Sequence, residues 1–121
     1  MASFNIEFYQ KADGSEPAKI FVDSLNAKMR AKAVMMLDLL SKNGNNLREP
    51  YSKHVSDGIF ELRTKVGSDI SRVMYFFYVG HKIILTHGFV KKTQKTPPNE
   101  IRRAKQYRAD YLRRESMRDE H

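Results

Sequence analysis

The sequence predicts an α+β fold, in which two helices pack on a small antiparallel sheet and a basic helix ends the domain. Residues 3–9 alternate between apolar and polar side chains, as a half-buried strand does. Residues 15–42 carry apolar side chains at helical spacing, and residues 59–90 hold three β segments separated by short turns. The resulting order, β-α-α-β-β-β-α, is typical of α+β domains.

Caps and apolar stripes predict the first two helices. Ser15 is a candidate N-cap, with Pro17 in the first turn, for a helix of about three turns. The second helix is expected from about Ala27 to Lys42, with Asn43-Gly44 as its C-terminal stop. Their apolar stripes comprise Ile20, Phe21 and Leu25 in the first helix, and Met29, Ala33, Met36, Leu37 and Leu40 in the second.

The middle of the chain predicts a three-strand antiparallel meander, with the N-terminal strand as a separate member of the sheet. Ile59–Val66, Ile70–Val79 and Lys82–Val90 are the three strands. Glycine at the first position of Gly80-His81 favours a type II′ hairpin turn. Residues 45–57 are polar and are expected to be irregular.

The last element is predicted to be a helix that follows Thr96 as N-cap and has Pro97 and Pro98 in its first turn. Its apolar side consists of Ile101, Ala104, Tyr107 and Tyr111. We expect residues 1–112 to form a single domain and residues 113–121 to be a frayed or disordered tail.

Charge and composition narrow the classes of function. The 121 residues carry a net charge of +8, and residues 91–118 hold ten basic and three acidic side chains. A basic surface of this kind attracts polyanions such as nucleic acids. The chain has no cysteine and no closely spaced histidine pair, so we expect no metal and no cofactor. No apolar run approaches the roughly 20 residues of a membrane span, which predicts a cytoplasmic protein with no membrane partner.

Basic side chains are predicted to gather at one end of the sheet. Glu61, Arg63 and Lys65 share one face of their strand, which is open and polar if the core lies on the other face. The hairpin brings Arg72 close to Lys65 or Val66. Lys91, Lys92 and Lys95 follow the last strand. Such a cluster would bind phosphate and stabilise charge in a phosphoryl transition state, or it would be a solvated strand with cross-strand ion pairs.

His54 is the candidate for proton transfer, because it precedes the strand that carries Arg63 and its pKa is near neutrality. His87 lies in a mostly apolar strand and is expected to have a structural role. Exposed cations of the last helix are predicted to contact RNA or an acidic partner segment without taking part in chemistry. They are Arg102, Arg103, Lys105, Arg108 and Arg113.

Three blocks of the sequence resemble the phage-derived, HigB-like branch of the RelE/ParE toxin superfamily. They are Asp57–Arg63, Ser71–Phe77 and His87–Pro97, and Glu100, Ile101 and Ala104 follow them. The resemblance covers about residues 3–112 and implies a RelE-like fold. It implies that the protein is the toxin of a bacterial type II toxin–antitoxin pair, whose antitoxin is often a helix-turn-helix protein.

The resemblance also implies roles for individual residues. Arg63, Lys65 and Arg72 match the positions that bind and activate the scissile phosphate in RelE-like enzymes, and Lys91 and Lys92 match a basic pair after the last strand. The tyrosine that commonly follows this pair is replaced by the stretch Thr96–Asn99, which leaves His54 as the substitute.

The expected function is therefore a toxin that cleaves messenger RNA on the ribosome by metal-independent attack of a 2′-hydroxyl. Arg63, Lys65, Arg72, Lys92 and His54 are the expected catalytic residues, and Lys91, Lys95 and the helix cations are expected to bind RNA. The alternatives are a ParE-like inhibitor of DNA gyrase and a non-catalytic basic module that binds nucleic acid.

Overall fold

The computed structural model describes residues 3–91 and 95–119 and confirms the α+β fold class. Four of its five strands are antiparallel neighbours, and the sheet has the order β1-β5-β4-β3-β2, with β1 parallel to β5. The elements are β1 (Asn5–Phe8), α1 (Pro17–Ser24), α2 (Ala27–Asn43), the 3₁₀ turn η1 (Gly44–Asn46), β2 (Ser52–Ser56), β3 (Ile59–Val66), β4 (Asp69–Tyr78), β5 (Lys82–Val90) and α3 (Pro98–Asp119).

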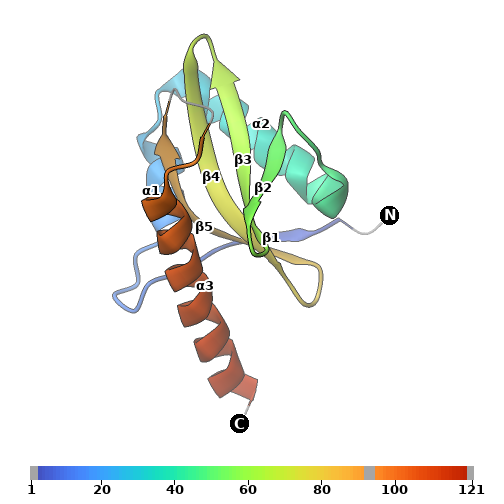
Figure 1. Cartoon of the computed structure of the whole chain (residues 1–121), viewed down its shortest axis with the longest axis vertical. Coiled ribbons are helices and arrows are strands. Elements are labelled where there is room, and N and C mark those ends of the chain that lie inside the picture. The colour runs from blue at the N-terminus through green and yellow to red at the C-terminus, as the bar shows by residue number, and fades with distance from the viewer. Residues whose placement is uncertain (1–2, 92–94, 120–121) are drawn as a thin grey trace.

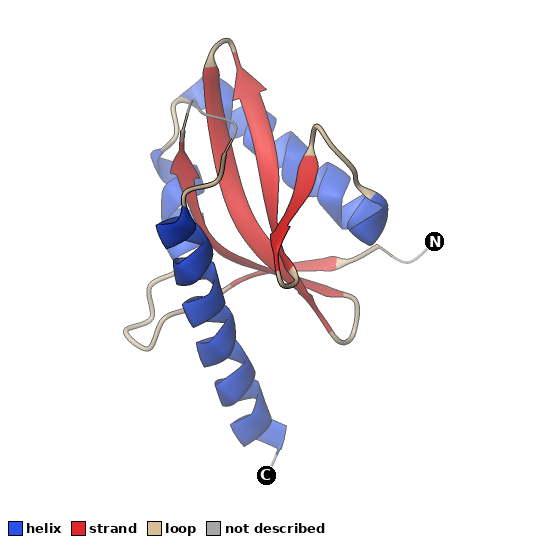
Figure 2. Cartoon of the chain, viewed as in Figure 1, coloured by secondary structure: helices blue, strands red, loops and turns tan. Residues whose placement is uncertain are grey.

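Helices cover both faces of the sheet. Helices α1 and α2 lie behind it in Figure 1, whereas α3 lies in front and extends past its lower edge. The same three layers are visible when the chain is coloured by secondary structure in Figure 2. No helix in the described part of the chain is long and apolar enough to cross a membrane.

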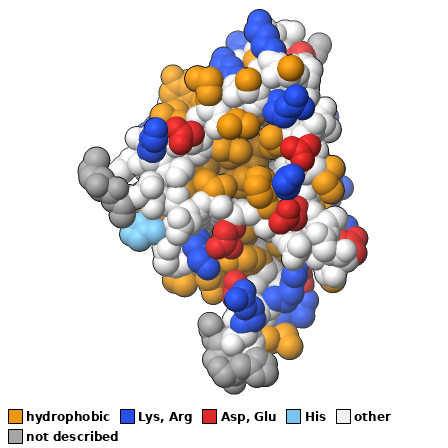
Figure 3. All heavy atoms as spheres, turned by 180° about the vertical axis from the view of Figure 1, so that it is seen from behind, with side chains coloured by type: hydrophobic (Ala, Val, Ile, Leu, Met, Phe, Trp, Pro, Cys, Tyr) orange, Lys and Arg blue, Asp and Glu red, His pale blue; other side chains and the backbone are white. Residues whose placement is uncertain are grey.

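The α1/α2 face of the sheet carries the larger apolar cluster. It joins Leu62, Val73, Tyr75, Ile83 and Leu85 of the sheet to Ala18, Val22, Met36 and Leu40 of the helices. The predicted stripe of α2 is confirmed, since Met29, Ala33, Met36 and Leu40 are all buried. In α1, however, Ile20 is 58% exposed, and Ala18 and Val22 take the buried positions. Figure 3 shows the outer surface of the molecule on this side, with hydrophobic side chains in its middle and charged side chains around them.

The α3 face has a second apolar cluster, which confirms the predicted apolar side of the last helix. Tyr9, Ile59, Met74, Phe76 and Ile84 pack there with Ala104, Ile101, Tyr107 and Tyr111.

Helix α3 continues to Asp119, although a frayed or disordered tail is predicted from residue 113. Arg114 explains the difference, because it bonds both to Asp110 one turn earlier and to the backbone carbonyl of Gln10. Tyr9 donates a hydrogen bond of 2.6 Å to the same Asp110 carboxylate. The contacts of Asp110 therefore attach this part of α3 to the chain that follows β1.

Strand β2 is not predicted from the sequence, which indicates an irregular segment over residues 45–57. Its composition is polar, but Ser52 is buried and its hydroxyl is hydrogen-bonded to the Tyr75 hydroxyl. The turn to β3 is formed by Asp57 and Gly58, both with positive φ (50° and 80°). Asp-Gly is a favoured pair for a type I′ hairpin, so the turn rather than apolar alternation supports the strand.

Two local predictions are also wrong. Gly80 and His81 both have positive φ (82° and 58°), whereas a type II′ turn has positive φ only at its first central residue. Ser15 does not cap α1. Its hydroxyl donates to Asp13 instead, and α1 begins with no side-chain cap at Glu16.

Candidate active site

A buried carboxylate, Glu61, organises the polar half of the α3 face. The Nε and Nη2 atoms of Arg63 both lie 2.7 Å from Glu61 Oε1. The second oxygen, Oε2, accepts a 2.7 Å hydrogen bond from the Thr96 hydroxyl and lies 3.9 Å from Arg72 Nη1. The side chains of Glu61 and Arg72 have no solvent exposure, whereas Arg63 keeps 12%. Each carboxylate oxygen thus has a cationic neighbour.

Strand register explains why these groups meet. Glu61 and Arg63 are two residues apart on β3, so their side chains point to the same face. Arg63 is opposite Arg72 on β4, and Arg72 is opposite Phe89 on β5. Two guanidinium groups side by side repel each other, and the shared carboxylate offsets this repulsion.

Arg72 is enclosed on several sides. Its guanidinium lies 5.9 Å from the centre of the Phe89 ring, and its Nη1 donates to the Lys95 carbonyl at 3.4 Å. Burial lowers the pKa of Arg72, and the nearby Glu61 charge opposes that shift. An arginine remains protonated at neutral pH even so. Arg72 is therefore a fixed positive charge behind Arg63, and Arg63 is the more accessible of the two.

Thr96 connects this cluster to α3. The sequence predicts Thr96 as the N-cap of the helix, but α3 begins at Pro98, so Thr96 lies one residue before the N-cap position, and its hydroxyl donates to Glu61. Thr96 itself is only 6% exposed. The segment entering α3 is therefore attached to the centre of the sheet by a hydrogen bond to a charged group, and bonds of this kind are stronger than neutral ones.

His87 forms a separate contact between β5 and α3. Its Nε2 lies 3.1 Å from Glu100 Oε1, and its Nδ1 lies 3.2 Å from the Thr86 hydroxyl. Burial lowers the pKa of His87, while Glu100 raises it and Arg103 adds a small lowering. This contact joins the first turns of α3 to the sheet and does not include Arg63 or Arg72.

The structure brings part of the predicted cation cluster together. Arg63 and Arg72 are adjacent, and the backbone of Lys95 contacts Arg72. Lys65 is exposed on the same face of β3, two residues beyond Arg63. Lys91 is exposed at the end of β5, where its backbone N–H donates to Ile70, the residue paired with Lys65. Lys92 lies outside the described residues.

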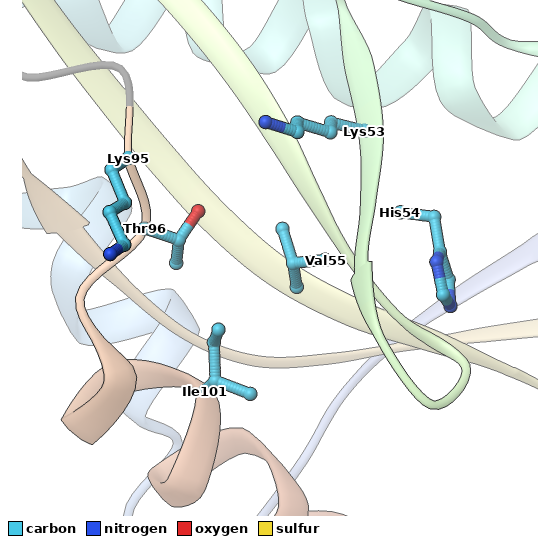
Figure 4. Close-up of a pocket in the computed structure, with 6 residues that line it drawn as sticks. All are labelled: Lys53, His54, Val55, Lys95, Thr96 and Ile101. Atoms are coloured by element: carbon cyan, nitrogen blue, oxygen red, sulfur yellow. The ribbon is translucent and has the colours of Figure 1, made fainter.

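His54 is not brought to this cluster. It lies in β2 opposite Phe60, and its ring packs against Phe60, whose side chain belongs to the α1/α2 side of the sheet. Its Nε2 accepts a hydrogen bond from the backbone of Gly58. Figure 4 shows Lys53 and Val55 extending from β2 toward Thr96, with His54 turned to the other side of the strand.

The predicted cations of α3 divide into two groups. Arg102, Arg103 and Arg113 are exposed, and Lys105 is half-buried. Arg108 is different, because it donates to the Asp57 carbonyl at 2.6 Å and its side chain is only 20% exposed. Arg108 therefore holds the β2–β3 turn against α3.

Two central residues of the cluster, Glu61 and Thr96, are not predicted to have these roles. The sequence places Glu61 on an open face, where it would form an exposed ion pair. The signal that would have identified it is the apolar side of α3, which must cover a sheet face. An acidic side chain on a covered face requires cationic partners. Among residues 3–91 and 95–119 no group of three or more acidic or histidine side chains could hold a metal ion.

Together, the five-strand, mostly antiparallel sheet and the helices on its two faces are consistent with a small RelE-like fold. The sequence profile of a family described as phage-derived protein Gp49-like (DUF891) matches residues 21–109. The chain belongs to this family, which is a RelE/HigB-like toxin family. The comparison with curated protein sequences gives no match.

Proposed function

We propose that this protein is the toxin of a type II toxin–antitoxin pair and an endoribonuclease that cleaves messenger RNA on the ribosome in the cytoplasm. The observation that carries the proposal is the position of Arg63. It is oriented by two contacts with a buried carboxylate and supported from behind by a second arginine. A preorganised guanidinium of this kind suits a phosphate whose negative charge increases during reaction.

The proposed reaction is an internal transfer at phosphorus. The 2′-oxygen forms a bond to phosphorus and loses its proton to solvent water, and the bond to the 5′-oxygen breaks as that oxygen gains a proton from solvent. The products are a 2′,3′-cyclic phosphate and a 5′-hydroxyl end. Negative charge builds on the nonbridging oxygens, where nearby fixed cations lower the barrier.

The described cations have distinct places in this proposal. Arg63 would contact the scissile phosphate. Lys65 and Lys91, on either side of the end of the β3–β4 hairpin, would hold the RNA backbone. Arg72 has no exposed surface, so its positive charge would act through the shared carboxylate and not by direct contact. The ring of His54 packs against Phe60 on the other side of β2, so this proposal gives it no role at the scissile phosphate.

The exposed cations of α3 provide the proposed contacts with larger partners. Arg102, Arg103 and Arg113 face solvent and would contact ribosomal RNA, or an acidic segment of the antitoxin, which we expect to be a helix-turn-helix protein. Because such contacts are electrostatic, we expect binding to weaken as salt rises.

The test is to express Arg63→Ala briefly, with Arg30→Ala as the matched control, and to map transcript ends against reading frame. Arg30 is an exposed arginine of α2 on the other side of the sheet. Removing one contact made in the transition state costs about 100-fold or more in rate. We therefore expect cleavage in frame with wild type and Arg30→Ala, and none above background with Arg63→Ala.

Purified proteins with the same thermal stability separate a catalytic effect from misfolding. If a folded Arg63→Ala protein cleaves like wild type, Arg63 does not have the proposed role. If wild type arrests growth without cutting RNA, the nuclease proposal fails. Accumulation of cleaved DNA–gyrase complexes would then point to gyrase as the target.

A further inference from the structure

A pocket of about 360 Å³ lies between β2 and the start of α3, next to the buried ion cluster. Its volume is within the range of small-molecule sites, about 300–1,000 Å³. Figure 4 shows that its two walls come from different elements: Lys53 and Val55 extend from β2, and Lys95, Thr96 and Ile101 face them. Distant parts of the chain therefore form one open recess.

The side chains of the pocket combine an apolar wall with a cationic rim. Val55 and Ile101 both belong to the apolar cluster under α3 and are partly exposed toward the recess. Lys53 is half-buried opposite Glu61, yet its amine forms no ion pair with a carboxylate of the described chain. A planar group with apolar faces and an attached anion would match both features.

Two residues, Lys95 and Thr96, belong both to the pocket and to the surroundings of the ion cluster, since the Lys95 carbonyl accepts from Arg72. Thr96 lines the pocket and also donates its hydroxyl proton to Glu61, which holds Arg63. Along β3, Glu61 and Arg63 are two residues apart, a separation of about 7 Å. Lys53 is paired with Glu61, so the rim of the pocket lies about the same two-residue separation from Arg63.

We propose that this pocket binds the base of the nucleotide adjacent to the scissile phosphate, with Lys53 contacting the neighbouring phosphate. The inference rests on the proposed ribonuclease function and adds a base-binding subsite to it. The base would lie between Val55 and Ile101, where apolar contact does not require a particular sequence. Lys53 is a binding residue in this scheme, and no chemical step involves it.

The test is a methyl and arginine side-chain NMR titration of the whole protein at low salt with two probes. One probe is a 2′-O-methyl RNA trinucleotide, in which the attacking hydroxyl is blocked. The other is the same sugar–phosphate chain without bases. We expect both probes to shift the Arg63 signal, but only the trinucleotide with bases to shift the methyl signals of Val55 and Ile101.

Substitution of Lys53 tests the rim. We expect Lys53→Ala to raise the dissociation constant of the trinucleotide about fivefold, the effect of losing one charge-assisted contact. Lys28→Ala, an exposed lysine of α2 on the other side of the sheet, should leave it unchanged.

The outcomes separate the two proposals. If the trinucleotide shifts Arg63 but neither Val55 nor Ile101, the base subsite is wrong and the phosphate site stands. If neither probe shifts Arg63, Val55 or Ile101, the base subsite is wrong, and the cleavage assay with Arg63→Ala decides the ribonuclease proposal separately. Equal binding by Lys53→Ala and Lys28→Ala would remove Lys53 from the site.

Discussion

Glu61 and Leu62 are neighbours in the sequence, but their side chains lie on opposite faces of the sheet. Leu62 enters the apolar cluster beneath α1 and α2, and Glu61 holds two arginines and a threonine beneath α3. Both are buried almost completely, at 1% and 0% exposure. One strand therefore supports two very different interiors.

The two interiors contribute differently to stability and to the proposed function. On the α1/α2 face, burial of apolar surface is favourable without any particular partner. On the α3 face, each buried charge depends on specific partners, and removing any one of them leaves the rest unbalanced. The proposed chemistry lies on this second face, where the interior is more sensitive to single changes in polar groups.

The largest expected effect is from Glu61→Gln. Neutralising the carboxylate leaves Arg72 buried beside Arg63 without a counter-charge, and breaking a buried ion pair costs about 3–5 kcal/mol. Urea unfolding measures the loss. A decrease of less than 1 kcal/mol would show that the cluster is more hydrated than its burial indicates.

A double variant, Glu61→Leu with Arg72→Met, sharpens the same comparison. Replacing a buried ion pair by apolar residues of similar size is often neutral or stabilising. We expect the free energy of unfolding of this variant to lie within about 1 kcal/mol of the wild-type value. We also expect it to have lost growth arrest, because Arg63 is no longer oriented. Retained toxicity would separate the cluster from the proposed function.

On the opposite face we expect Leu62→Ala to cost about 3 kcal/mol, through lost burial and the cavity that remains. The protein that stays folded at low temperature should still cleave RNA at the wild-type rate, since Arg63 and its partners are unchanged. Unfolding curves and single-turnover cleavage at 10 °C measure the two effects. A proportional loss of rate in fully folded protein would show that the two faces are coupled.

Thr96→Val should have a smaller effect, of about 2 kcal/mol, because it removes one hydrogen bond to a buried carboxylate while keeping the shape of the side chain. Thr64→Val is the matched control, since Thr64 is equally buried and faces α2. We expect the free energy of unfolding of Thr64→Val to be close to that of wild type. Equal losses in the two variants would mean that the contact with Glu61 adds little.

The smallest expected effect is a pH dependence from His87. Its native pKa is below the reference value of 6.5, mainly because of burial, so the unfolded chain binds more protons as the pH falls below 6.5. Stability from this group is therefore complete above pH 6.5 and declines below it, by at most about 1.4 kcal/mol per pH unit.

Thermal unfolding of wild type and His87→Gln between pH 5 and 7.5 measures this decline, and the variant should show a flatter profile. Glu100 and Arg103 of α3 and Thr86 of β5 face the imidazole and are unchanged in it. Parallel profiles for the two proteins would assign the pH dependence to other groups.

Patterns within a single element could be predicted from the sequence. The bounds of β3 and β5 match the prediction, as do the buried side chains of α2. The reason is that the spacing of apolar residues within one element shows where the element runs and which of its faces is covered. Strand β2 could not be predicted in this way. Its support comes from the Tyr75 hydroxyl and from the contact of Arg108 with the β2–β3 turn, and both partners are distant in the sequence.

In the candidate site, too, local features could be predicted and features that depend on distant segments could not. Proximity of Arg63 and Arg72 could be predicted from the hairpin, although the sequence indicates a register in which Arg72 is next to Lys65 or Val66. The central position of Glu61 could not be predicted, because it depends on where Thr96 and α3 are placed over the sheet. Which side of β2 carries His54 also depends on strand pairing that its polar sequence does not encode.

The parallel pairing of β1 with β5 affects the order in which the protein assembles during translation. The N-terminal strand reaches its neighbour in the sheet only after residues 82–85 have been synthesised, and the bond from Thr96 to Glu61 forms later still. A nascent chain that ends at β4 contains both arginines but lacks the segment that encloses them. The proposed active site is therefore complete only after Thr96 has been synthesised, and a shorter nascent chain that already carries Arg63 and Arg72 lacks one contact of their shared carboxylate.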